Sequence, residues 1–214
     1  MRFALLAAAT RLALATPALA DDHMGVTAER NDHHATLKAA VASDVRGDDR
    51  ARDQYRHPFE TLDFFQVKPG MTVVDYMPAG GWYTRVLVPY LGSEGRYVGL
   101  TPDPAAADGE RFANYFSGLP GGFTESSPGW NLSGAPMSIY GSQDVPEAMQ
   151  GSVDRALIFR EMHNLLRSGV LYTELTRIRG MLKDDGMLGI GQHRAKADAP
   201  GDYTNGSNGY LRQE

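Results

Sequence analysis

Residues Phe64–Leu91, FFQVKPGMTVVDYMPAGGWYTRVLVPYL, decide the fold of this chain. Within them, residues 71–76 form a short apolar run that ends near an acid, which predicts a strand buried on both faces. Residues 79–81, Ala-Gly-Gly, supply the small side chains that a tight turn requires. From Tyr83 onward the apolar side chains recur at the spacing of one helix face. The stretch therefore predicts one strand–turn–helix unit.

This unit has the form of a ligand-binding corner. In open α/β sheets, a strand, a glycine turn and a helix N-terminus together bind nucleotides. The helix N-terminus offers free N–H groups to an anion, and Asp75 can pair with a positive group of a ligand. Short glycine motifs are also common by chance, so the glycines can serve only to let strand and helix pack closely. These residues alone leave both interpretations open.

Further motifs follow from residue 57 to the C-terminus. They are Pro58–Leu62, Val67–Asp75, Gly80–Thr84, the run from Val153 to Asn164, Leu182–Gly186 and His193–Arg194. With these motifs the chain resembles the class I S-adenosylmethionine-dependent methyltransferases, and most closely an exported branch that carries a leader peptide. The resemblance implies an α/β, Rossmann-like fold with a mostly parallel sheet and helices on both faces.

The resemblance also implies a cofactor, S-adenosylmethionine, and a methyl acceptor whose identity the sequence does not give. The implied contacts to the methionine end of the cofactor are Asp75, Gly80, Gly81 and Trp82. Asp103 would contact the ribose, and Gln143 and Asp144 the adenine. The acceptor side would be lined by Arg160, His163, Asn164 and His193. Histidine, with a pKa of about 6.5, is suited to accept a proton, although His163 can instead cap the following helix.

Two positions depart from the family pattern. In the first motif of the family, glycines follow the acid at alternate positions, and here those positions hold Met77, Ala79 and Gly81. The second strand of the family ends in an acid, whereas this chain has Thr101 there and Asp103 two residues later. Methyl transfer remains the leading interpretation, and these departures support the alternative, a non-catalytic protein that binds S-adenosylmethionine or a nucleotide. A nicotinamide oxidoreductase ranks last because Gly-x-Gly-x-x-Gly is absent.

The N-terminal residues predict a leader and a polar segment ahead of the domain at 57–214. Residues 1–20 combine an early arginine, an apolar core and an Ala-Leu-Ala cleavage site, which predicts a signal peptide and a periplasmic or secreted protein. Arg11 interrupts the apolar core and leaves a retained amphipathic helix as the alternative. Residues 21–56 predict a solvated tail and then a charge-rich helix, with residues 48–53 as its exposed face. We expect no metal ion at the His/Asp residues of this tail.

Bulk properties exclude several classes of protein. The formal net charge is −5, and it becomes more negative without the two arginines of residues 1–20. This balance argues against a non-specific nucleic-acid partner. After the leader, no segment approaches the ~20 apolar residues that span a bilayer. The sequence has 0 cysteines, which excludes disulfides and thiolate metal sites.

The later part of the chain carries three more expectations. Residues 105–116 predict a helix. Residues 117–135 are rich in Gly, Ser and Pro and predict a long irregular segment, in which Phe123 and Trp130 form either a lid over the site or part of a surface insertion. Residues 209–212 predict the start of another helix. The sequence ends before the last helix and antiparallel hairpin of the resembled fold, which predicts either a fragment or a five-stranded sheet with an exposed edge.

Overall fold

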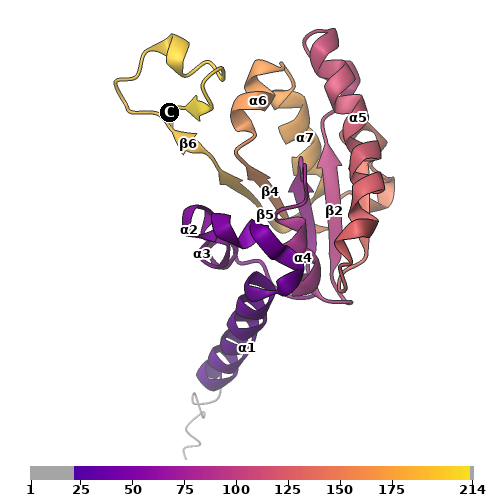
Figure 1. The fold of residues 1–214 in the computed structure, drawn as a ribbon, viewed down its shortest axis with the longest axis vertical. Coiled ribbons are helices and arrows are strands. Elements are labelled where there is room, and N and C mark those ends of the chain that lie inside the picture. Colours follow the sequence, from indigo (N-terminus) through magenta and orange to yellow (C-terminus); the bar gives the residue numbers. More distant parts are fainter. Residues whose placement is uncertain (1–21, 213–214) are drawn as a thin grey trace, which may run out of the picture.

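Five parallel strands form the central sheet, in the order β3-β2-β1-β4-β5 (Figure 1). The structure is a computed structural model that describes residues 22–212, so the predicted signal peptide lies outside the described residues. The strands are β1 Thr72–Tyr76, β2 Arg96–Thr101, β3 Met137–Gly141, β4 Val153–Phe159 and β5 Leu182–Gly191. This order is that of a Rossmann-like sheet, and it reverses between β1 and β4. The predicted fold class is confirmed.

Helices cover both faces of the sheet because its strands are apolar on both sides. Val73 of β1 belongs to one core cluster and its neighbour Val74 to another, as the alternation of a strand requires. The first cluster lies under α1 Asp22–Ala42, α3 Pro58–Phe64 and α4 Thr84–Leu91. The second lies under α6 Met162–Arg167 and α7 Leu171–Met181.

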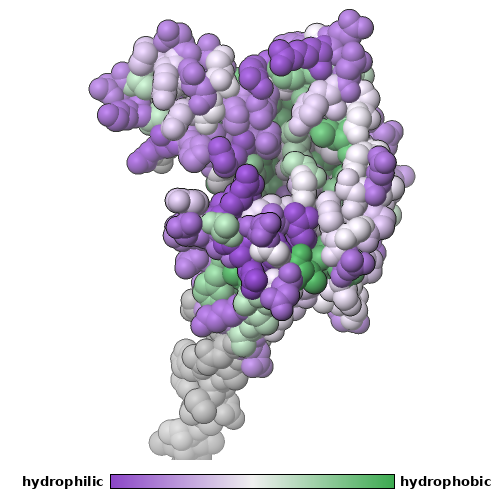
Figure 2. All heavy atoms as spheres, viewed as in Figure 1, coloured by the Kyte–Doolittle hydropathy of each residue, from purple (hydrophilic) through white to green (hydrophobic). Residues whose placement is uncertain are grey.

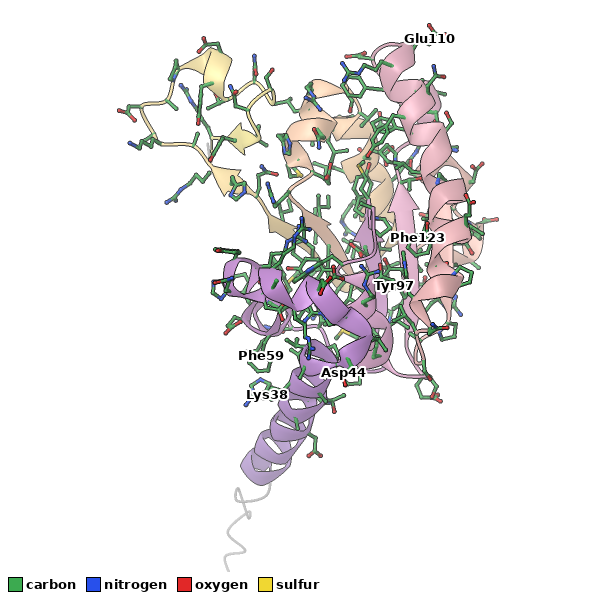
Figure 3. The ribbon with its side chains drawn as sticks, in the orientation of Figure 1. Lys38, Asp44, Phe59, Tyr97, Glu110 and Phe123 are labelled. Carbon is green, nitrogen blue, oxygen red and sulfur yellow. The ribbon has the colours of Figure 1, made fainter. Side chains whose placement is uncertain are left out.

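The N-terminal segment is more ordered than its sequence predicts. Helix α1 includes most of the residues expected to form a solvated tail, because Leu37 and Ala40 are buried against the rest of the protein. His34 Nε2 lies 2.7 Å from Asp63 Oδ1, and Lys38 lies 5.5 Å above the Phe59 ring (Figure 3). The 3₁₀ helix η1 Asp44–Arg52 and the short helix α2 Asp53–Arg56 follow.

Helix α5 corrects the expectation for residues 105–135. It runs from Glu110 to Ser126, through three glycines and a proline, and the 3₁₀ helix η3 Ser127–Trp130 follows it. Burial of Phe116 and Phe123, seven residues apart on one helix face, outweighs the poor helix propensity of this stretch. Phe123 stacks on Tyr97 of β2 with ring centres 6.2 Å apart (Figure 3), and Trp130 lies 5.2 Å from Phe123. Both aromatic residues pack in or against the core, and neither forms a lid.

The C-terminal segment forms a small second sheet instead of the predicted helix. β6 His193–Arg194 pairs in parallel with β7 Tyr210–Leu211, and the 3₁₀ helix η6 Gly201–Tyr203 lies between them. Contacts of the Tyr210 ring with the rings of His193 and Tyr203, at 5.6 and 5.5 Å, fix the extended conformation. In Figure 1 this segment stands beside α6, beyond the carboxyl ends of the strands.

Three short 3₁₀ helices complete the chain: η2 Pro104–Ala106, η4 Ser142–Asp144 and η5 Glu147–Met149. None of the described helices is both long and apolar enough to cross a membrane.

Candidate functional site

A pocket of about 650 Å³ lies at the carboxyl ends of β1, β4 and β5. This volume is in the range of small-molecule sites, and the position is the point where the strand order reverses. Part of the N-terminal segment, residues 49–56, forms one wall. Figure 2 shows this face of the molecule, with hydrophilic side chains gathered around the hollow below the C-terminal segment.

The pocket brings together some, but not all, of the residues that the sequence singled out. Those that line it are Asp75, Gly80, Trp82, Arg160, His163, Asn164 and His193. Those that do not line it are Gly81, Asp103, Gln143 and Asp144. The residues expected on the acceptor side therefore share one cavity with three of the four expected at the methionine end, whereas Gly81 and the residues expected to contact the ribose and adenine lie outside it.

The turn after β1 has a left-handed backbone at alternate residues. Met77, Ala79 and Gly81 have φ angles of 53°, 48° and 75°. These are the three positions at which the resembled motif has glycines, and a left-handed backbone is what glycine adopts most easily. The turn is closed by the Gly81 N–H, which donates to Pro78 O at 2.8 Å. The backbone shape of the motif is thus present although two of its glycines are not.

Gly81 itself faces away from the pocket. A Cβ atom there would lie 2.5 Å from the ring of Trp130. A larger side chain at Gly81 would thus disturb Trp130 before it could block a ligand. At the neighbouring Gly80 a Cβ would meet no atom within 4 Å.

Asp75 is the buried acid of the site. Its Oδ2 accepts a hydrogen bond of 2.9 Å from the Tyr97 hydroxyl, and Thr84 Oγ1 lies 2.7 Å from the same hydroxyl. Burial raises the pKa of Asp75 to about 7, although the Tyr97 hydrogen bond opposes this rise. The carboxyl group therefore titrates near neutral pH, and a bound cation would favour its ionised form.

The N-terminal wall is fixed to the turn by Asp49 and Trp82. Trp82 Nε1 donates to Asp49 O at 3.0 Å, and Arg85 Nε donates to Asp49 Oδ2 at 2.7 Å. The guanidinium groups of Arg46 and Arg56 lie 4.8 and 4.6 Å from the centre of the Trp82 ring. Sequence reasoning missed this wall, because the charge pattern of residues 48–53 is also that of an exposed face.

The β4 side of the pocket carries Glu161, His163 and Asn164. Asn164 Nδ2 donates to Glu161 Oε2 at 2.7 Å, and burial raises the pKa of Glu161. His163 Nδ1 lies 3.4 Å from Gln192 Nε2. Burial is the main cause that lowers the pKa of His163, and the nearby Arg167 and Arg160 act in the same direction. His163 is therefore neutral at pH 7, and no side chain caps the N-terminus of α6.

Arg160 and His193 complete the acceptor side that the sequence predicted. Arg160 is exposed and has a left-handed backbone, with φ of 60°. The His193 ring is exposed and lies against Tyr210. Among residues 32–212, no group of three or more His, Asp or Glu side chains could hold a metal ion.

A second polar cluster lies where β2 and β3 end, around Glu174 of α7. Glu174 is fully buried. Its carboxylate accepts from the Tyr76 hydroxyl at 3.0 Å, the Ser142 hydroxyl at 2.7 Å and the Asp103 N–H at 3.2 Å. Arg177 NH2 donates to Asp103 Oδ2 at 2.9 Å. Asp103, expected to contact a ribose, is thus held by α7.

Sequence reasoning did not single out Glu174 and Arg177. The residues expected to contact the adenine are also occupied locally. Gln143 Nε2 donates to Asp144 Oδ2 at 2.7 Å, and both side chains are exposed.

Comparison with known proteins finds similarity of structure alone. No family model matches the sequence, and a search of curated proteins found no significant match. One similar solved structure is a SAM-dependent methyltransferase from Aquifex aeolicus, at 17% identity over 78% of this chain and 77% of that one, with a TM-score of 0.48. Another is a cyclopropane-fatty-acyl-phospholipid synthase-like protein from Lactobacillus casei, at 16% identity over 75% and 58% of the two chains, with a TM-score of 0.45.

A third similar structure is coclaurine N-methyltransferase bound to N-methylheliamine and SAH. It is 16% identical over 61% of this chain and 32% of that one, with a TM-score of 0.40. At these identities and scores, none of the three decides what this chain binds or transfers.

Proposed function

We propose that this chain binds S-adenosylmethionine in the pocket and transfers its methyl group to an acceptor. The observation that carries the proposal is the turn after β1. A buried acid, Asp75, is followed by three alternate left-handed residues at the point where the strand order reverses. Strained backbone of this kind persists where the surrounding structure requires it, and such places are enriched at ligand sites.

The residues of the pocket fit the methionine end of the cofactor. This end carries an ammonium and a sulfonium, and the nearby acids Asp75 and Glu161 line the same cavity. Tyr83 and Phe159 stack with ring centres 4.1 Å apart and add an apolar wall. The residues expected to contact the ribose and the adenine do not line this pocket, and Asp103 is bound by Arg177. Only a movement of Arg177 would free Asp103 for a ribose.

Methyl transfer requires mainly that the protein position the cofactor and the acceptor. When bound, S-adenosylmethionine supplies an electrophilic methyl group that an aligned nucleophile can accept. Arg160, Asn164 and His193 line the pocket and would orient an acceptor. A neutral His163 would take up a proton if the nucleophile carries one.

A second candidate function is binding without catalysis. The ion pair between Asp103 and Arg177, at 2.9 Å, favours it, because it withholds the one acid that could replace the missing ribose contact. The predicted export favours it as well, since S-adenosylmethionine is made in the cytoplasm.

Calorimetry with S-adenosylhomocysteine tests the proposal. The parent chain should bind it, and Gly80→Val should weaken binding at least about tenfold, because the new side chain would enter the pocket. Asp75→Ala should lose a charge-assisted contact of roughly 1.5–3 kcal/mol. Gly118→Val is the matched control, since a Cβ at this exposed glycine of α5 also meets nothing within 4 Å.

The outcomes separate the candidates. A parent chain that does not bind S-adenosylhomocysteine contradicts the methyl-transfer proposal. If Gly80→Val and Asp75→Ala bind as the parent does, the cofactor pocket lies elsewhere. Binding by the parent, without formation of S-adenosylhomocysteine from S-adenosylmethionine and any acceptor, favours the second candidate.

A further inference from the structure

Three arginines line the pocket without an acidic partner. Arg52, Arg56 and Arg160 form no ion pair with any of the residues that the structure describes. The fourth arginine of the pocket, Arg85, is paired with Asp49 at 2.7 Å. The formal charge of the chain is −5, so acids are available in the sequence, but none of the described acids forms an ion pair with these three side chains.

The three guanidinium groups act on one another. Burial lowers the pKa of Arg56, and the charges of Arg52 and Arg160 lower it further. Asp49 and Glu161 also line the pocket, and their charges act on Arg56 and Arg160 respectively. Among the described residues, however, neither acid forms an ion pair with these arginines. Partly desolvated like charges are costly unless a counter-charge joins them.

Two of these three arginines are held in place by further contacts. Arg160 has a φ angle of 60°, an unusual backbone for a residue with a side chain, and its N–H donates to Gly191 O at 2.7 Å. The guanidinium of Arg56 lies over the Trp82 ring, 4.6 Å from the ring centre. Arg56 is thus held through its side chain and Arg160 through its backbone.

We propose that the acceptor side of the pocket takes a small molecule with an anionic group, a carboxylate or a phosphate, bound by Arg52, Arg56 and Arg160. Guanidinium groups bind both of these anions in a bidentate manner. The assignment of this molecule as the methyl acceptor rests on the proposed function. The cofactor does not supply the missing charge, because its sulfonium, ammonium and carboxylate leave it net positive.

Binding of inorganic phosphate and of malonate to the full chain tests this proposal. Calorimetry is done at low ionic strength, with and without saturating S-adenosylhomocysteine. The parent should bind at least one of the two anions. Arg56→Gln and Arg160→Gln should each weaken that binding about tenfold or more, and Arg160→Gln should fold normally because its side chain is exposed. Saturating S-adenosylhomocysteine should change the anion affinity by less than about threefold.

Arg111→Gln is the matched control. It makes the same charge change on an exposed residue of α5 that does not line the pocket, and it should bind the anions as the parent does. Equal weakening in Arg111→Gln would show only a general charge effect and would overturn the proposal.

Other outcomes are equally decisive. The proposal is overturned if neither anion binds, or if both pocket variants bind as the parent does. Displacement of the anion by S-adenosylhomocysteine would mean that the arginines hold the carboxylate of the cofactor, which also overturns it. If S-adenosylhomocysteine does not bind but the anion does, and the pocket variants lose it, the anion site stands and the methyl-transfer proposal fails.

Discussion

The two ends of the same sheet edge differ in how their polar groups are satisfied. At the β1–β4 corner, Arg56 and Arg160 form no ion pair with any described residue, and the backbone is left-handed at Met77, Ala79 and Arg160. At the β2–β3 corner, the groups around Glu174 are bonded to one another and to α7. The first, the open corner, keeps unpaired charge and strain. The second, the closed corner, uses its polar groups to hold the fold.

Tyr76 joins the two corners. Tyr76 lines the pocket, and its hydroxyl donates to Glu174 at 3.0 Å on the other side. The Glu174 cluster is therefore in direct contact with β1, the strand that ends at the pocket.

The largest effect is expected from Glu174→Ala, which breaks the closed corner. The change leaves the Tyr76 hydroxyl, the Ser142 hydroxyl and the Asp103 N–H without their buried acceptor. We expect the free energy of unfolding to fall by roughly 3–5 kcal/mol, measured by urea denaturation at pH 7. Glu174→Gln, which keeps the volume and one carbonyl acceptor, should cost clearly less. A loss below about 1 kcal/mol in Glu174→Ala would show that these bonds do not stabilise the protein.

Asp75→Asn should have the opposite effect on stability at the open corner. The folded pKa of Asp75 is raised from 3.8 to about 7, so the folded state holds this proton more tightly than the unfolded state does. The associated stability is fully present below about pH 4 and is lost as pH rises to about 7, by up to about 4 kcal/mol. The asparagine variant lacks this loss.

Urea denaturation of the parent and Asp75→Asn from pH 4 to 8 checks this prediction. The variant should gain stability relative to the parent as pH rises. The raised pKa values of Glu161 and Glu174 are common to both proteins, so the difference isolates Asp75. Curves that stay parallel across this range would show that Asp75 has an ordinary pKa in the folded protein.

The sequence predicted the strands better than the polar contacts, for a physical reason. Strand β1, Thr72–Tyr76, lies within the apolar run 71–76 that predicted it, because burial on both faces leaves a local pattern. The pairing of Asp103 with Arg177 leaves no local pattern in the sequence, since the two residues are 74 positions apart and meet only when α7 packs on the sheet. The C-terminal end of helix α5 was predicted too early, because the local cost of its glycines and proline is visible in the sequence and the burial of Phe123 is not.

The smallest effect concerns the strain in the turn after β1, which sets the open corner apart. Ala79 is exposed and has a φ angle of 48°, which costs a residue with a Cβ roughly 1–2 kcal/mol. Glycine removes this cost but loses about 0.5–1 kcal/mol to the greater freedom of the unfolded chain. We therefore expect Ala79→Gly to raise the free energy of unfolding by up to about 1 kcal/mol in urea denaturation.

The control for this change is Ala105→Gly. Ala105 is also exposed but is not among the residues with a left-handed backbone, so only the entropic loss applies and the protein should become less stable by about 0.5–1 kcal/mol. The sign of the difference between the two variants therefore reports the strain directly. Equal losses in both would mean that the turn relaxes in solution, and the open corner would then differ from the closed one in charge alone.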